Sequence, residues 1–254
     1  TTTGSKGPTG TTGTTTGSKG TTGTTGTTTG SKATTGTTGT TGTTGTTGTV
    51  GSTTSGGTTT TGTISYNSSG PVILKSNTTV SGLSIDLSNS STVGISGNGV
   101  SNVHINNCRI VNTSSFAIDI KGCSNITIDN CYIANVGFGV YAEGGCTGVK
   151  VNNNQFLNIN GISTTYFGHA VQFNGVTGGG NQINYNRVEN IAGVALHPHD
   201  ILSVYQSNGI RGDSIQVIGN WIRGGQLSKW PTSNAVACGI VLGDVNGSYQ
   251  VARN

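Results

Sequence analysis

The chain has 254 residues, of which 44 are glycine, only 8% are charged and only 6% are aromatic. Soluble domains average about 25% charged residues, and a net charge of +4 gives a weak field, so the composition excludes a nucleic-acid binder that relies on a dense basic face. The absence of a run of about 20 apolar residues excludes a transmembrane helix. The composition changes near residue 63, which predicts a tail over residues 1–62 and one domain over residues 63–254.

Residues 1–62 are a Thr/Gly-rich repeat with no aromatic and no acidic side chain. A 13-residue unit begins at residues 1, 14 and 27, and within it glycine recurs every third position. That period suits a polyproline-II-like or collagen-like helix, whereas the lack of apolar side chains also fits a flexible linker. The tail resembles the Gly-Thr-Thr collagen-like stretches of some microbial surface proteins. We therefore expect a stalk or assembly arm, with its threonines as candidate O-glycosylation sites.

The second segment repeats with a longer period, which predicts stacked β-coils. Five short stretches share an alternating apolar pattern that ends in a turn; they start at Val103, Ile126, Val149, Gln182 and Ile215. The turn position steps along the chain by 23, 23, 32, 34 and 34 residues, and it is held by Cys108, Cys131, Asn154, Asn186, Asn220 and Asn254. Units that cannot bury an inner face alone stack on their neighbours. We therefore predict an all-β parallel solenoid in which these turn side chains form a structural ladder.

Alternation along the strands also sorts side chains into an inner and an outer face. The inward column is apolar and comprises Ile118, Ile120, Val140, Ala142, Val171, Phe173, Leu202, Val204, Ile240 and Leu242. One outward row comprises Asp119, Tyr141, Gln172, Ser203 and Val241, and the next begins with Lys121, Glu143 and Asn174.

Four of the five cysteines come in pairs 23 residues apart, Cys108 with Cys131 and Cys123 with Cys146. Stacked coils place such pairs about 4.8 Å apart at the backbone, which is within disulfide range. The spacing therefore allows two disulfides or two buried thiol stacks, and an extracellular setting favours the disulfides. No Cys or His spacing indicates a zinc site, and we expect neither a metal ion nor a cofactor.

Residues 63–254 resemble the right-handed parallel β-helix superfamily, the pectate-lyase-like fold. The likeness is carried by stretches such as FGHAVQFNGVTGGGNQINYNRVEN and IQVIGNWIRGG. In enzymes of this superfamily the outward face of one strand set forms a sugar groove, so the resemblance implies that role for the row of Asp119 and Tyr141. Hydrolases of the superfamily need two carboxylates, but Asp119 is the only carboxylate in its row.

A second polar cluster lies in the longer loops after residue 160. It comprises His169, His197, His199 and Asp200, and alignment of the coils puts His169 beside Asp200 on adjacent turns. Such a cluster could do acid–base work, or it could tie the loops to the solenoid wall. The candidate catalytic residues are therefore Asp119, His169, His199 and Asp200. The candidate glycan-binding aromatics are Tyr141, Tyr166 and Trp230.

These features favour an extracellular or cell-surface structural or adhesive protein. We expect a fibre or filament subunit that self-associates through residues 1–62 and through the open coil that ends at Asn254. The alternatives are a polysaccharide lyase or glycoside hydrolase, which leaves enzymatic activity open, and a glycan-binding receptor module. In each case a carbohydrate is the candidate ligand.

Overall fold

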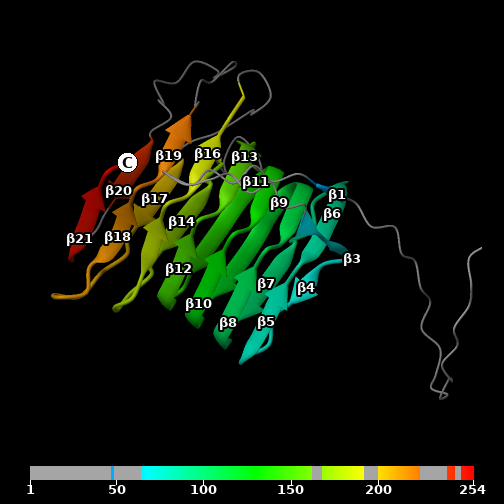
Figure 1. The fold of residues 1–254 in the computed structure, drawn as a ribbon. Coiled ribbons are helices and arrows are strands. Elements are labelled where there is room, and N and C mark those ends of the chain that lie inside the picture. The colour runs from blue at the N-terminus through cyan, green and yellow to red at the C-terminus, as the bar shows by residue number, and fades with distance from the viewer. Residues whose placement is uncertain (1–46, 49–63, 162–167, 192–199, 224–238, 244–246) are drawn as a thin grey trace, which may run out of the picture. The chain divides into compact units, whose positions relative to one another are not determined.

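The computed structural model describes residues 47–48, 64–161, 168–191, 200–223, 239–243 and 247–254 (Figure 1). These residues form strands, turns and loops, and no helix long and apolar enough to cross a membrane occurs among them. The chain divides into two compact units, residues 1–41 and 42–254. The first unit lies outside the described residues, as do residues 49–63, so the predicted tail and its boundary near residue 63 stay predictions. From the tail, only β1 (Thr47–Gly48) is described, and it pairs antiparallel with β2 (Ile64–Ser65).

One wall of the solenoid is a seven-stranded parallel sheet, which we call the first sheet. Its strands run side by side in Figure 1, and each belongs to a different coil. In spatial order they are β5 (Thr78–Ser81), β8 (Ser101–Asn106), β10 (Ser124–Asp129), β12 (Thr147–Asn152), β15 (Gln182–Asn184), β18 (Ile215–Ile218) and β21 (Tyr249–Ala252).

The other walls belong to a twelve-stranded parallel sheet, the second sheet. Its strands are β3 (Asn67–Ser69), β4 (Val72–Ile73), β6 (Leu83–Ser90), β7 (Ile95–Asn98), β9 (Arg109–Lys121), β11 (Tyr132–Glu143), β13 (Gln155–Ile159), β14 (Val171–Asn174), β16 (Arg187–Glu189), β17 (Leu202–Tyr205), β19 (Trp221–Arg223) and β20 (Ile240–Gly243). The first half of β11 pairs with β13 and its second half pairs with β14. From β11 onward the second sheet therefore divides into two walls, β13–β16–β19 and β14–β17–β20, so each coil has three sides.

The interior is a stack of aliphatic columns. In the column predicted from alternation, Ile118, Val140, Val171 and Leu202 pair in register and are fully buried. Phe173 is also fully buried, and the first sheet adds further columns of Val and Ile. Each such side chain contributes about 1.5–3 kcal/mol on burial. The all-β parallel solenoid predicted from the repeat is thus confirmed.

A ladder of asparagines links the coils at one corner. The backbone N–H of Asn154 donates to Oδ1 of Asn186 (3.0 Å), that of Asn186 donates to Asn220 (2.9 Å), and that of Asn220 donates to Asn254 (2.9 Å). The Nδ2 groups of Asn154, Asn186 and Asn220 donate to backbone carbonyls in the first-sheet strand of the preceding coil. These amides are almost completely buried, so every bond satisfies a group that would otherwise be stranded away from water.

The residue before each ladder position has a left-handed backbone. Asn107, Asn130 and Asn153 have φ values of 49°, 52° and 57°, and the equivalent Tyr185 has 56°. Asparagine tolerates this region better than other side chains because its amide can bond locally. An asparagine therefore makes the bend at the first three of these turns, and in the pair Asn153–Asn154 one asparagine makes the bend and the next belongs to the ladder.

Cys108 and Cys131 occupy the two ladder positions before Asn154. The backbone N–H of Cys131 donates to Oδ1 of Asn154 (2.9 Å), which continues the ladder. All four described cysteines, Cys108, Cys131, Cys123 and Cys146, are buried free thiols in the structure. The structure therefore has the thiol-stack arrangement, and neither candidate disulfide is formed in it. A side-chain hydrogen bond with Cys108, together with burial, raises the pKa of Cys131 well above its usual value, which makes this thiol a poor nucleophile.

Candidate functional site

The strand register sets the predicted outward row on the second sheet. Asp119 of β9 lies opposite Tyr141 of β11, which lies opposite Gln172 of β14 and then Ser203 of β17. In the next row Lys121 lies opposite Glu143, which lies opposite Asn174. These rows belong to one wall of consecutive coils. We call the surface formed by Phe116, Asp119, Tyr141, Glu143 and Asn174 the Asp119 face.

Aromatic rings from two coils meet on the Asp119 face. The rings of Phe116 and Tyr141 stack with centroids 5.3 Å apart and an interplanar angle of 21°. Phe138 is buried beneath them, with its centroid 5.0 Å from that of Phe116. The register between β9 and β11 shifts by one residue between Val136 and Phe138, which brings Phe138 opposite Phe116. This irregularity places the rings beside Asp119.

Asp119 is a carboxyl group in a poorly solvated setting. Burial raises the pKa of Asp119, and the nearby Glu143 carboxylate raises it further, while Lys121 opposes the change. Its Oδ1 is buried and has no hydrogen-bond partner in the structure. A buried acceptor without a partner is rare in native proteins and calls for a bound proton, water or ligand. Asp119 is thus poised either to accept a ligand hydroxyl or to carry a proton.

Ordered polar groups surround this carboxyl. Nζ of Lys121 lies 3.0 Å from Oε1 of Glu143, and Nδ2 of Asn174 donates to the Tyr141 hydroxyl at 2.6 Å. Burial raises the pKa of Tyr141, so its hydroxyl keeps its proton and can donate to a ligand. The face therefore offers a ring surface, a carboxyl group and a fixed phenol side by side.

His169 joins the same aromatic cluster from the next coil. Its ring centroid lies 5.0 Å from that of Phe138, and its Nδ1 lies 2.5 Å from the backbone oxygen of Asp200. His169 and Asp200 are therefore neighbours on adjacent coils, as the coil alignment predicts, and the contact runs through the Asp200 backbone. Gly139 allows this approach, because its N–H donates to the His169 carbonyl (3.0 Å) and a Cβ there would lie 2.2 Å from the carbonyl oxygen of Ala170.

The other predicted site residues cannot be placed. His197, His199, Tyr166 and Trp230 lie outside the described residues, so the roles predicted for them stay predictions. Among the described residues, no group of three or more His, Cys, Asp or Glu side chains could hold a metal ion.

A second polar surface, which sequence reasoning missed, lies on the first sheet. Three adjacent strands, β5, β8 and β10, together with Asn77 just before β5, present nine outward polar side chains in three rows. Strand register sets two of the rows, Thr79, His104 and Thr127, and Ser81, Asn106 and Asp129. Side-chain hydrogen bonds link the third row, Asn77, Asn102 and Asn125. A shallow depression of about 530 Å³ lies over the row of Asn102, the row of His104 and Asp129; we call it the polar groove. Its period in the sequence is that of the coils, so the outward positions of these strands would have revealed it.

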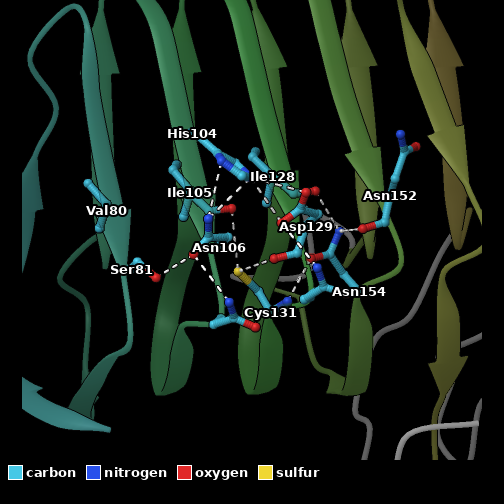
Figure 2. Close-up of polar contacts among 12 residues, drawn as sticks. Val80, Ser81, His104, Ile105, Asn106, Ile128, Asp129, Cys131, Asn152 and Asn154 are labelled. Atoms are coloured by element: carbon cyan, nitrogen blue, oxygen red, sulfur yellow. Dashed lines mark hydrogen bonds and ion pairs between the residues drawn. The ribbon is translucent and has the colours of Figure 1, made fainter.

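His104 is the hub of this surface (Figure 2). Its Nε2 lies 3.1 Å from both carboxylate oxygens of Asp129 on the neighbouring strand, and its Nδ1 lies 3.1 Å from Nδ2 of Asn106. Since an amide nitrogen only donates, Nδ1 accepts and Nε2–H donates to Asp129. Asn106 in turn accepts from the Ser81 hydroxyl of the preceding coil. The network therefore links three coils and fixes the tautomer and orientation of the imidazole.

Comparison with protein-family models decides the family. The model described as a right-handed β-helix region matches residues 23–177 and, in a second match, residues 72–242. The chain belongs to the right-handed β-helix family. None of the curated proteins and none of the solved structures compared with it gives a significant match.

A right-handed β-helix fits a surface module as well as an enzyme-like module, because function on such a scaffold depends on the side chains that the coils present. In this β-helix the structure brings Asp119, Tyr141 and His169 into one cluster. It separates them from the polar groove, which lies on a different sheet.

Proposed function

We propose that this β-helix is a carbohydrate-binding module of an adhesive surface protein, and that the Asp119 face is its binding site. One observation carries the proposal: the partnerless, buried Oδ1 of Asp119 lies in a surface built from stacked aromatic rings. Saccharides present an apolar C–H face and a rim of hydroxyls. The C–H face packs on aromatic rings, and the hydroxyls need oriented hydrogen-bond acceptors and donors.

The acceptors and donors on this face are held before a ligand arrives. Asn174 fixes the Tyr141 hydroxyl, and Lys121 fixes Glu143. All of these residues sit on strands that pair on both sides. Little side-chain entropy is therefore lost on binding, which favours affinity for a weakly binding ligand such as a sugar.

The wider setting belongs to the same proposal. The low charge and the Thr/Gly-rich segment of residues 1–62 support a stalk or assembly arm at the cell surface, with O-glycosylated threonines and a filament as the assembled form.

Substitution of Asp119 and Tyr141 tests the binding site. Binding is measured on a glycan array of neutral and acidic oligosaccharides. Asp119→Asn and Tyr141→Ala should each lower the affinity for any bound glycan at least about ten-fold, because each loses one hydrogen bond to a charged group or one ring contact. Tyr132→Ala is the matched control, because Tyr132 is a half-buried tyrosine of the same strand that pairs with Arg109 and Gln155 instead. No glycan binding by the intact chain, or equal binding by all three variants, would refute the proposal.

The raised pKa of Asp119 favours one second candidate, a polysaccharide hydrolase or lyase. A carboxyl group whose pKa is raised holds its proton to a higher pH than an ordinary carboxyl group and can act as a general acid, and Glu143 supplies a second carboxylate nearby. Incubation of the intact chain with polysaccharides, followed by assay of new reducing ends and of unsaturated products, tests this candidate. Turnover that Asp119→Asn abolishes supports the enzyme, and binding without turnover supports the module.

A further inference from the structure

We propose that the polar groove of the first sheet is a second ligand site, which takes an uncharged polyhydroxylated ligand such as one or two saccharide units. The groove is lined by Asn77, Thr78, Thr79, Asn102, Val103, His104, Asn125, Thr127 and Asp129. The depression has a volume of about 530 Å³ and is open to solvent.

Some side chains of the polar groove hydrogen-bond to one another, and others have no hydrogen-bond partner among the described residues. His104 and Asp129 bond to each other, and Asn102 donates to Asn77 at 2.9 Å. The hydroxyls of Thr79 and Thr127 have no partner among the described residues, although they flank His104 in the same row. The groove therefore has a fixed centre between two open hydroxyls that can each donate and accept.

A few strands further along the same sheet, the outward side chains hydrogen-bond to one another. There Asn152 donates to Gln182 at 2.9 Å, and Asn184 donates to Gln216 at 3.1 Å. Those long amides satisfy one another from coil to coil, whereas the short threonines at the groove cannot reach a neighbour. The contrast sets the groove apart from the rest of the first sheet.

The chemistry of the lining selects the class of ligand. Asp129 disfavours an anion, and no Phe, Tyr or Trp side chain lines the groove, so an apolar ligand finds little to pack against. His104 and Asp129 are the only histidine or carboxylate side chains in the lining, which is fewer than the three protein ligands of a typical zinc site. Hydroxyl, amide and carboxylate groups together match the mixed donors and acceptors of sugar hydroxyls.

Nuclear magnetic resonance of the full chain tests the site. Neutral oligosaccharides, added one at a time, should shift the imidazole nitrogen signals of His104, which are assigned by comparison with His104→Gln. Thr127→Val and Asp129→Asn keep the shape of their side chains, and each should lower the affinity about ten-fold or more, the effect of one lost hydrogen bond to a charged or fixed partner. Gln250→Ala, an exposed position of β21 on the same sheet, is the control and should change the affinity less than two-fold.

The site stands independently of the Asp119 face. Asp119→Asn and Tyr141→Ala should leave the His104 shifts unchanged, so either site can fail without the other. The proposal is overturned if no neutral oligosaccharide moves the His104 signals, if Thr127→Val and Asp129→Asn bind as the intact chain does, or if Zn²⁺ or Ca²⁺ alone moves those signals while saccharides do not.

Discussion

The Asp119 face and the polar groove lie on strands of neighbouring coils, yet their carboxyl groups are in opposite situations. Asp119 sits beside stacked rings, its Oδ1 has no partner, and burial raises its pKa. Asp129 bonds through both oxygens to His104 and through one of them to Asn130. The coil fixes where a side chain stands, but the side chains stacked above and below it decide whether a carboxylate is solvated, paired or stranded.

The largest expected effect comes from the ladder that holds both surfaces. In Asn154→Ala the backbone N–H of Cys131 loses its acceptor and the carbonyl of Ile128 loses its donor. We expect the free energy of unfolding to fall by about 2–4 kcal/mol, since each buried polar group left unsatisfied costs about 1–3 kcal/mol. Urea denaturation followed by circular dichroism measures the change.

Asn153→Gly is the matched control for the ladder variant. Asn153 has a φ of 57°, a region that glycine enters without strain, so this neighbouring change should alter the free energy of unfolding by less than about 1 kcal/mol. If both variants unfold at the same urea concentration as the intact chain, the ladder does not hold the coils together, and the two surfaces do not share a support.

The two carboxyl groups should respond in opposite directions to the same chemical change. Because the pKa of Asp119 is raised in the folded chain, folding takes up a proton there, and stability falls as pH rises from the unfolded pKa through the raised folded one. Asp119→Asn removes this penalty, so the variant should be more stable than the intact chain at pH 7, with the difference fading toward pH 4.

Asp129→Asn supplies the contrast. It removes a charge-assisted pair with His104, so we expect a loss of about 1 kcal/mol at pH 7. Thermal unfolding of both variants between pH 4 and pH 8 measures the effects. Equal shifts of the same sign at both positions would contradict the distinction between a stranded and a paired carboxylate.

The sequence could reveal the coils because their signals are local and periodic. Alternation placed Ile118 and Val140 in the core, and the repeated turn placed Asn154 and Asn186 on a ladder; each follows from strand geometry and spacing alone. The setting of Asp119 could not be predicted, because Phe138 reaches its place through a register shift that strict alternation does not allow. Spacing brought Cys108 and Cys131 together, but it says nothing about their oxidation state.

The groove escaped prediction for a different reason. Thr79, His104 and Thr127 are unremarkable in the chain, and they become a row only when three coils are laid side by side. The family resemblance directs attention to the strands that carry Asp119 and Tyr141, and these three residues lie on the other sheet.

The smallest expected effect concerns the contribution of the Lys121 charge to the pKa of Asp119. Lys121 lies against Glu143 and lowers the pKa of Asp119, opposing the effects of burial and of Glu143. In Lys121→Met that opposition is lost and Glu143 is left unpaired, so the pKa of Asp119 should rise further while the melting temperature hardly changes, as expected for an exposed ion pair. Carboxyl carbon signals of Asp119, followed by nuclear magnetic resonance as the pH is varied, report the pKa directly.

Lys150→Met on the first sheet is the control, because Lys150 pairs with Thr127 and Gln182 there. An unchanged titration of Asp119 in Lys121→Met would mean that burial alone sets its pKa, and that the Asp119 face differs from the polar groove by solvation and not by charge.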